Sequence, residues 1–344
     1  LTTLINLNYL MSNLKEILIK RKICKSVWFM RQAGRYLPEF REIRSKNKNF
    51  INLCLDSELS TEITLQPVKR YNLDSAIIFS DILMVPYALN QKVEFKKDLG
   101  PVLENFNLKK FFNNDRVSFT QKLNQVYKAI HKTREKLDKK KSLIGFIGAP
   151  WTLLIYMLGA KKSKKDIDYK KIKEKESEIN IILDKLHEYL CFHIENQVNA
   201  GADVIQIFDS WAGLIPQDSL PNFCYIPNLK LVDFCKEKKI PVICFPKGIN
   251  KNYKEFNNVV SPDGINLDYE VDPNWVVKNL PNVVLQGGLD PRVLLSNNQE
   301  FLREAKKYLD IFKGLPYIFN LGHGLLPETD PDKVSRLIKF YREF

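Results

Sequence analysis

The sequence predicts one α/β domain folded as a (β/α)8 TIM barrel. Eight short apolar runs of strand type are spread along the 344 residues, helical patterns separate them, and most runs are apolar on both faces. Strands buried on both faces are typical of parallel sheets joined by right-handed helical crossovers. Eight such units at this length fit a closed barrel better than an open doubly wound sheet, and no GxGxxG or phosphate-loop motif follows the first run.

The predicted elements follow one another along the chain. The strands are expected at 27–30, 76–79, 143–147, 204–208, 242–245, 264–267, 283–286 and 317–320. Apolar residues at helical spacing predict a helix around Val117, Leu123, Val126, Tyr127 and Ile130, and another around Ile179, Ile182, Leu183, Leu186, Leu190 and Ile194. We therefore expect a poorly defined N-terminal extension at 1–25 and a single barrel domain at 26–344.

Composition excludes several classes of protein. Hydrophobic residues make up 44% of the chain and aromatic residues 11%, which is enough for a large core and excludes a disordered or collagen-like chain. No apolar run reaches the roughly 18 residues that would predict a membrane-spanning helix. The net charge of +13 has two readings: an anionic partner, or a lysine-rich solvated surface.

The six cysteines show no CxxC, HxC or zinc-ribbon spacing, so we expect no structural metal. Scattered cysteines in a large chain indicate reduced core residues in a reducing compartment. The first residues lack the basic and apolar regions of a secretory signal. We expect a cytoplasmic protein, with import into an organelle left open.

Polar and glycine-rich residues follow each predicted strand. In a barrel of this kind, the chemistry lies on the loops after the carboxyl ends of the strands. These loops therefore predict a site at one rim, and the residues concerned are Arg31 and Gln32, Ser80 and Asp81, 148–151, Asp209 and Ser210, Pro246 and Lys247, Asp268, 287–290 and 322–324.

The segment 28–44 is dense in arginine. A guanidinium group is suited to bidentate binding of carboxylates or phosphates. Arg31 and Arg35 have few acidic neighbours, so we expect them to bind an anionic ligand. For Arg41, pairing with the nearby Glu39 or Glu42 is the favoured expectation.

Asp81 and His323 are the candidate site residues that the sequence favours most. Asp81 lies within the apolar run 77–85, where a carboxylate is costly to bury unless a cation or donors face it; the alternative is a helix cap. His323 stands between two glycines, which permit a close approach of the backbone. The residues alone leave Tyr156 and Ser210 undecided between core and site.

Several of these segments resemble the uroporphyrinogen decarboxylase family. The segment 28–39, WFMRQAGRYLPE, is similar to the family signature, and further similarities are FSDIL at 79–83, GFIGAPWTL at 145–153, IFDSWAG at 207–213, and NLGHG at 320–324 with Pro327. The resemblance implies a (β/α)8 barrel, a homodimer, and no metal or organic cofactor. It implies a small-molecule substrate, uroporphyrinogen III, whose four acetates become methyls to give coproporphyrinogen III and four CO2.

The resemblance also implies the residues of the site. The implied catalytic residues are Asp81, Arg31, Tyr156 and His323. The implied substrate-binding residues are Arg31, Gln32, Arg35, Arg44, Asp81, Tyr156, Phe208, Ser210 and His323. The chain departs from the family pattern at three places. Ser26 stands where proline is usual, Gly288 stands at the asparagine position of the usual motif QGNLDP, and the segment around Asp268 is divergent.

Two rival functions remain at this point. A corrinoid- or thiol-dependent methyltransferase on a related barrel would need a zinc-held thiolate, and no HxC motif is present. A nucleic-acid-binding module would need aromatic residues interleaved with the basic runs, which are mostly lysine. We therefore expect neither nucleic acid nor a membrane as a partner.

Overall fold

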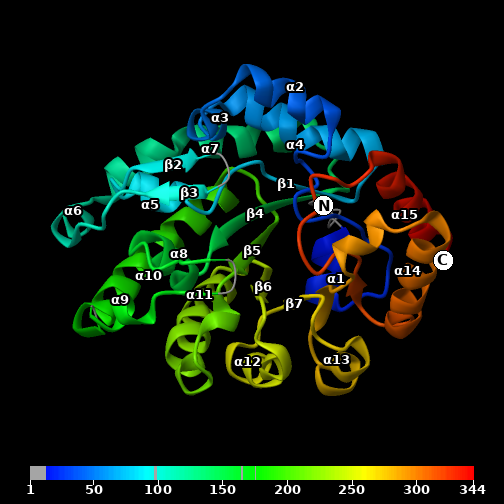
Figure 1. The fold of residues 1–344 in the computed structure, drawn as a ribbon. Helices are drawn as coiled ribbons and strands as arrows, with labels where there is room; N and C mark the ends of the chain where they lie inside the picture. The colour runs from blue at the N-terminus through cyan, green and yellow to red at the C-terminus, as the bar shows by residue number, and fades with distance from the viewer. Residues whose placement is uncertain (1–12, 97–98, 164–165, 175) are drawn as a thin grey trace, which may run out of the picture.

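The computed structural model describes residues 13–96, 99–163, 166–174 and 176–344, and in them a parallel sheet is wrapped by helices (Figure 1). Seven strands run side by side in the order β1-β4-β5-β6-β7-β8-β9, and every neighbouring pair is parallel. This confirms the α/β barrel class predicted from the sequence. The strands are β1 (Ser75–Ile77), β4 (Ser142–Gly148), β5 (Val204–Asp209), β6 (Val242–Pro246), β7 (Gly264–Leu267), β8 (Val284–Gly287) and β9 (Tyr317–Ile318).

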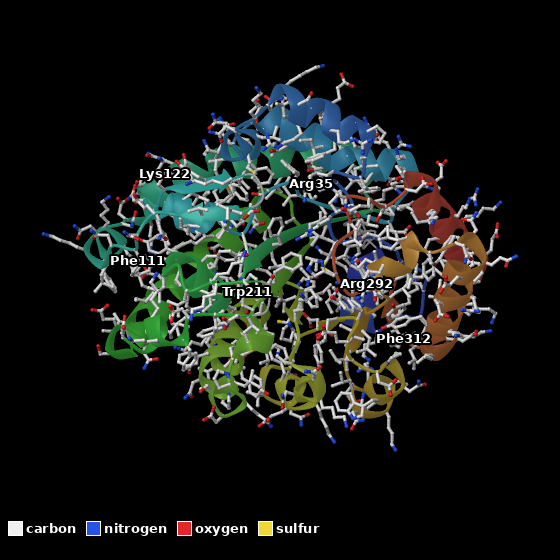
Figure 2. The ribbon with its side chains drawn as sticks, in the orientation of Figure 1. Arg35, Phe111, Lys122, Trp211, Arg292 and Phe312 are labelled. Carbon is white, nitrogen blue, oxygen red and sulfur yellow. The ribbon has the colours of Figure 1, made fainter. Side chains whose placement is uncertain are left out.

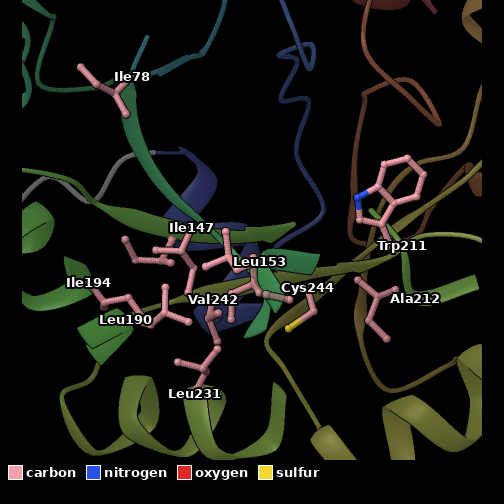
Figure 3. Close-up of a cluster of buried hydrophobic side chains, with 14 of the residues drawn as sticks. Ile78, Ile147, Leu153, Leu190, Ile194, Trp211, Ala212, Leu231, Val242 and Cys244 are labelled. Carbon is pink, nitrogen blue, oxygen red and sulfur yellow. The ribbon is translucent and has the colours of Figure 1, made fainter. Parts of the chain in front are cut away.

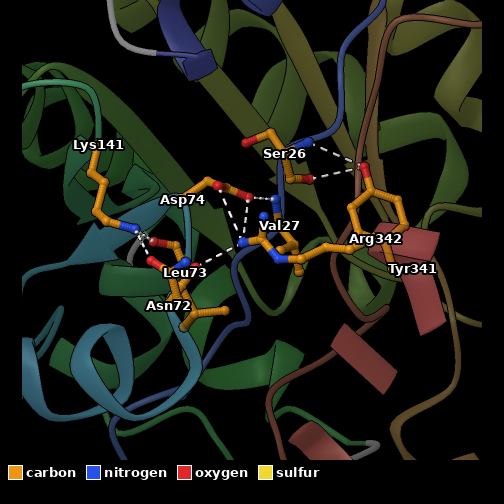
Figure 4. Close-up of polar contacts among 8 residues, drawn as sticks. All are labelled: Ser26, Val27, Asn72, Leu73, Asp74, Lys141, Tyr341 and Arg342. Carbon is orange, nitrogen blue, oxygen red and sulfur yellow. Dashed lines mark hydrogen bonds and ion pairs between the residues drawn. The ribbon is translucent and has the colours of Figure 1, made fainter. Parts of the chain in front are cut away.

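The segment 26–28 closes the ring between β9 and β1. The Trp28 N–H donates to the Phe319 carbonyl at 3.3 Å, and the Phe319 N–H donates to the Ser26 carbonyl at 2.9 Å. On the other side, the Asp74 N–H donates to the Val27 carbonyl at 3.1 Å, and the Asp74 carboxylate accepts from the Val27 N–H at 2.9 Å (Figure 4). The eighth position of the barrel is therefore filled, although by only one bridge pair, Val27 with Phe319.

The strand predicted at 27–30 is wrong as a regular element, and the cause is local. The Phe29 N–H donates to the Gln32 side chain at 3.0 Å, and the Met30 N–H donates to the Asn320 side chain at 3.1 Å. Side-chain oxygens thus replace the ladder partners that a strand would need. The other seven predicted strands are confirmed within a few residues at their ends. The antiparallel pair β2 (Val93–Lys96) and β3 (Gly100–Leu103) was not predicted.

Fifteen α-helices are found in the described residues, and many begin at side-chain caps. The Asp56 carboxylate accepts from the N–H groups of Glu58 and Leu59, which satisfies the first turn of a long helix. The helices are α1 (Asn13–Lys20), α2 (Pro38–Lys46), α3 (Phe50–Cys54), α4 (Ser57–Tyr71), α5 (Met84–Ala88), α6 (Leu108–Phe112), α7 (Arg116–Lys136), α8 (Pro150–Met157), α9 (Tyr169–Lys173), α10 (Glu176–Asn199), α11 (Ile226–Glu237), α12 (Tyr253–Val260), α13 (Pro273–Asn279), α14 (Asn298–Phe312) and α15 (Pro331–Glu343).

The main core lies between the outer face of the sheet and the surrounding helices. Figure 3 shows part of it, where Leu190 and Ile194 of α10 approach Val242 of β6. Both predicted helical stripes form helices, and all six apolar residues predicted for α10 are buried. In α7, Val117 is 67% exposed and is not part of the core, whereas the other four predicted residues are buried.

Helix α1 packs into the barrel at the end opposite the predicted site. Leu14, Ile17 and Leu18 are buried against inward-facing strand residues such as Ile144 and Val284. Residues 13–20, which fall within the predicted extension, therefore complete the inner core of the barrel. Next to this apolar cluster lie buried amide side chains. The Gln286 amide donates to the side-chain oxygens of Gln206 and Asn266, and the Trp28 indole donates to the side-chain oxygen of Gln286. No helix in the described part of the chain has the length and apolar character needed to cross a membrane.

Candidate active site

Asp81 is a partly buried carboxylate at the end of β1. One oxygen, Oδ1, accepts from the Leu83 N–H at 2.9 Å and so orders the turn that leads into α5. The alternative of a helix cap is wrong, because the N-cap of α5 is Leu83 and no side chain among the described residues caps that helix; the Asp81 bond lies in the turn before it. No residue in the described part of the chain donates to the other oxygen, Oδ2. Burial raises the pKa of Asp81 to about 6, and the Leu83 N–H and the charge of Arg31 oppose that rise.

Arg31 lies beside Asp81 on the loop that follows the closing segment. Its backbone is left-handed, with a φ of 60°, so its side chain leaves the loop in an unusual direction. Gly324 lies against this side chain: a Cβ there would be 2.6 Å from the Arg31 Cγ and 2.9 Å from its Nε. Arg31 is exposed at the rim, but protein atoms around its guanidinium remove part of the water, which is the main cause that lowers the Arg31 pKa; the charge of Asp81 opposes this change.

Tyr156, on α8, completes a group with Asp81 and Arg31. Burial and the charge of Asp81 raise the pKa of Tyr156 to about 12, whereas Trp211 and Arg31 lower it. The phenol therefore keeps its proton at neutral pH and can donate a hydrogen bond. Its ring lies edge-on to the Trp211 ring, with 5.8 Å between centroids. The structure thus brings together three of the four predicted catalytic residues.

Phe208 forms part of an aromatic surface inside the barrel. Its ring lies 5.7 Å from the Phe146 ring and 6.4 Å from the Phe245 ring, all on adjacent strands. The side chain is only half-buried, so one side remains accessible at the strand ends. Ser210 follows two residues later and is also partly exposed, and its hydroxyl makes no hydrogen bond within the described residues.

His323 is held in a loop that is packed tightly on both sides. A Cβ at Gly322 would be 2.8 Å from the Asp268 carbonyl carbon, so this glycine is needed for the close approach of two loops. The Leu325 N–H donates to the Met30 carbonyl at 2.9 Å, which joins this loop to the one that carries Arg31. The prediction that the glycines around His323 permit a close backbone approach is confirmed.

Arg35 and Arg44 border a separate hollow of about 370 Å³ on α2, which Phe40, Arg41 and Ser45 also line (Figure 2 labels Arg35). The Arg44 guanidinium donates to the Asn47 carbonyl and lies 5.8 Å from the centroid of the Phe50 ring. The expected pairing of Arg41 with a neighbouring acid is wrong. Arg41 donates to the carbonyls of Arg35 and Tyr36, at 2.9 and 2.8 Å.

The two acidic residues near Arg41 have other partners. Glu39 forms a bidentate ion pair with Arg70, at 2.8 and 3.0 Å, and Glu42 pairs with Lys46 at 2.8 Å. Arg41 therefore shapes the wall of the hollow by fixing the backbone on which Arg35 stands.

Gln32 is not at the surface of the site. It is 0% exposed, its oxygen accepts from the Phe29 N–H, and its amide donates to the Ser75 carbonyl at 3.1 Å. This geometry makes Gln32 the residue that fastens the Arg31 loop to the start of β1. The contact of Gln32 with substrate stays a prediction.

Asn320 is a positioning residue that sequence reasoning missed. Its Oδ1 accepts from the N–H groups of both Met30 and Leu321, at 3.1 and 2.8 Å. A single amide oxygen thus ties together the loops that carry Arg31 and His323. The sequence shows only an asparagine at the end of a predicted strand, and it does not show whether that side chain is buried or exposed.

Two of the departures from the family pattern have a structural explanation. The N–H of Ser26 donates to the Tyr341 hydroxyl at 3.1 Å, an interaction that proline could not make (Figure 4). Gly288 has a φ of 102°, and a Cβ there would lie 2.7 Å from the Tyr308 Cζ. The large buried side chain of Tyr308 therefore occupies the space that a side chain at 288 would need.

Asp268, in the third divergent segment, is a structural acid. Its Oδ2 accepts from the Gly248 N–H at 2.7 Å and from the Tyr253 hydroxyl at 2.9 Å, and its Oδ1 accepts from the Glu270 N–H. Within residues 13–96, 99–163, 166–174 and 176–344, no group of three or more His, Cys, Asp or Glu side chains could hold a metal ion.

Comparisons with known proteins agree with these features. The uroporphyrinogen decarboxylase (URO-D) family profile matches residues 24–344. The chain is 44% identical over 324 residues to a uroporphyrinogen decarboxylase of Rickettsia felis, covering 92% of each chain. It is 41% identical over 322 residues to that of Rickettsia bellii, covering 92% of this chain and 94% of the other.

Among solved structures, a methyltransferase from Methanosarcina mazei has a TM-score of 0.76 at 16% identity, covering 95% of this chain and 97% of the other. At that identity the likeness concerns the fold alone. The family profile spans the barrel together with every residue of the proposed site. The chain therefore belongs to the uroporphyrinogen decarboxylase family.

Proposed function

We propose that this protein decarboxylates uroporphyrinogen III, converting its four acetate side chains to methyl groups in tetrapyrrole biosynthesis. The observation that carries the proposal is the Asp81 carboxylate, which has one oxygen committed to the fold and the other open beside Arg31 and Tyr156. The family membership and the named relatives support the same activity. The methyltransferase alternative has support only from a fold likeness at 16% identity.

The proposed chemistry needs an electron sink. Loss of CO2 from an acetate on a pyrrole would leave a carbanion, so the ring carbon next to the one that bears the acetate chain is first protonated, which makes the acetate-bearing carbon part of a cation. The electron pair of the breaking C–C bond then neutralises this cation, giving an exocyclic methylene. Protonation of the methylene and loss of the ring proton give the methylpyrrole, so one proton is consumed for each CO2 released.

Asp81 has the central role in this scheme. Its open oxygen would accept hydrogen bonds from the pyrrole N–H groups and stabilise the positive charge as it develops. A fixed carboxylate in a partly water-excluded site supplies several kcal/mol of such stabilisation. Because the pKa of Asp81 is about 6, the group is mainly ionised at neutral pH, as the role requires.

The arginines and the remaining polar groups would bind the carboxylates of the substrate. Arg31 lies next to Asp81, so we assign it to the acetate under reaction and to positioning of the incoming proton. Arg35 and Arg44 would bind peripheral carboxylates along the hollow on α2. Tyr156, Ser210 and His323 would orient the reacting ring, and Phe208 would pack against its face.

Further parts of the proposal concern the whole protein. We propose a homodimer, a cytoplasmic location, a single catalytic domain at 26–344, and catalysis without metal or organic cofactor. The bacterial relatives are consistent with the location.

The decisive experiment is anaerobic incubation of metal-stripped protein with uroporphyrinogen III, followed by oxidation and chromatography of the porphyrins. We expect a series from eight carboxylates to four, unchanged by EDTA. An unchanged eight-carboxylate peak from folded protein would refute the activity, and a series that stops on addition of EDTA would refute independence from metal.

A further inference from the structure

The hydroxyl group of Thr152 lies between two segments that carry residues of the site. Thr152 is completely buried in the first turn of α8, one helical turn before Tyr156. Its hydroxyl donates at 2.7 Å to the carboxylate of Asp209, the last residue of β5. The same oxygen accepts from the Trp211 N–H at 3.2 Å. One hydroxyl therefore holds both sequence neighbours of Ser210.

Asp209 fixes the direction in which the Thr152 hydroxyl points. The carboxylate is buried, and its second oxygen accepts from the Asn228 amide at 3.3 Å. Burial raises the pKa of Asp209 to about 6, whereas the bonds from Thr152 and Asn228 lower it, so the group is mainly ionised at neutral pH. An ionised carboxylate only accepts hydrogen bonds. The Thr152 proton therefore points to Asp209, and the lone pairs of the hydroxyl are left to accept from Trp211.

The loop that follows β5 is fastened at further points. The Trp151 indole, also from the first turn of α8, donates to the Trp211 carbonyl at 3.1 Å. Two residues later, the Gly213 N–H donates to the Lys247 carbonyl at 2.9 Å, and a Cβ at Gly213 would lie 2.7 Å from the Gly248 carbonyl oxygen. The backbone of this loop therefore has little freedom to move.

We propose that Thr152 is a positioning residue, whose hydroxyl fixes the place of Ser210 relative to Tyr156. The inference rests on the proposed function, in which Ser210 and Tyr156 orient the reacting ring. Thr152 and Tyr156 belong to one helix, so the distance between them is set by that helix. The two hydrogen bonds of the Thr152 hydroxyl extend this fixed geometry to the loop that carries Ser210. Small errors in the placement of orienting groups lower the rate of the chemical step.

The test compares Thr152→Val with Thr133→Val, since valine has nearly the shape of threonine and lacks the hydroxyl. Thr133, in α7, is also completely buried, but its hydroxyl donates to the Ala129 carbonyl of its own helix at 2.7 Å. Because the Trp151 bond remains, we expect kcat for uroporphyrinogen III to fall about tenfold in Thr152→Val, with KM within about twofold. Thr133→Val should stay close to the wild type, and Thr152→Ser, which keeps the hydroxyl, should recover most of the rate.

A second substitution, Ser210→Ala, separates positioning from a general loss of stability. If Thr152 acts through Ser210, adding Thr152→Val to Ser210→Ala should lower kcat by less than about twofold further. A full tenfold loss in that background, or equal kcat in Thr152→Val and Thr133→Val, would overturn the inference. If Thr152→Val does not fold, Thr152→Ala removes the same hydroxyl and takes its place in each comparison.

Hydrogen exchange tests the same geometry without turnover. The Trp211 amide should exchange slowly in the wild type and in Thr152→Ser, and faster in Thr152→Val. Equal exchange rates in all three proteins would overturn the inference. If the wild type releases no CO2, the proposed function fails, and the expected pattern of exchange would still support the role of Thr152 in holding this loop.

Discussion

The contact between Gly324 and Arg31 permits a sharp test of the site. The backbone of Gly324 lies outside the left-handed region, so alanine introduces no strain there. The new Cβ would be 2.6 Å from the Arg31 Cγ, whereas optimal carbon–carbon separation is about 3.5 Å, so the arginine chain must move by about 1 Å. A misplacement of about 1 Å costs about 100-fold in rate, equivalent to about 2.7 kcal/mol of transition-state stabilisation.

Gly324→Ala should therefore lower kcat/KM about 100-fold while melting close to the wild type. The assay is anaerobic decarboxylation of uroporphyrinogen III with chromatography of the oxidised products. Arg31→Ala removes the side chain that would be displaced, so adding Gly324→Ala in that background should cost almost nothing further. Multiplicative effects of the two substitutions, or near-normal activity of Gly324→Ala, would refute the reasoning that Gly324 acts through Arg31.

Three further predictions follow from buried groups. Asp81→Asn should abolish most turnover but raise the melting temperature at pH 7.5, because ionisation of a carboxyl group with a raised pKa weakens the fold as pH rises from about 3.8 to about 6. The kcat/KM of the wild type should fall below pH 6, and a kcat/KM that does not change with pH would contradict the role of Asp81. His193 is buried against the Tyr127 hydroxyl at 3.0 Å and its pKa is lowered to about 3 by burial, so stability present above about pH 6.5 is lost as pH falls toward 3. In His193→Gln, the free energy of unfolding measured with denaturant should change less steeply with pH across that window, by about 1.4 kcal/mol per pH unit. Equal slopes in the variant and the wild type would disprove the role of His193. Gly288→Ala should destabilise by about 2–3 kcal/mol, with partial recovery on adding Tyr308→Leu, whereas no recovery would show that the φ of 102° alone is responsible.

Much of the fold could be predicted because the parallel strands carry their own signal. A run such as 242–245 is apolar on both faces, and a sheet covered by helices on one side and filled on the other buries it completely. The same regularity predicted that Asp81 and Arg31 lie at one rim, because the loops after parallel strands meet there. Tyr156 was assigned to the site only by the family resemblance. The family resemblance added the chemistry that these residue types perform.

Tertiary contacts decided the rest, because the relevant partners are far apart in the sequence. The run at 27–30 has the composition of a strand, yet the Met30 N–H donates to the side chain of Asn320, which is 290 residues away, and the strand pairing ends there. Arg41 has acids nearby in sequence, but those acids face Arg70 and Lys46, so it binds carbonyls instead. Likewise, no local pattern distinguishes the buried amide of Gln32 from a substrate ligand.

The sequence by itself determined the class of fold, the rim on which the site lies and the family to which the chain belongs, because periodicity and short motifs are local properties. Only the tertiary structure decided which polar groups face the site and which hold it together. That distinction depends on where each side chain finds its hydrogen-bond partner after folding. Gln32 and Asn320 use their side-chain oxygens to hold the loops of the site together, whereas one oxygen of Asp81 accepts no hydrogen bond from the described residues.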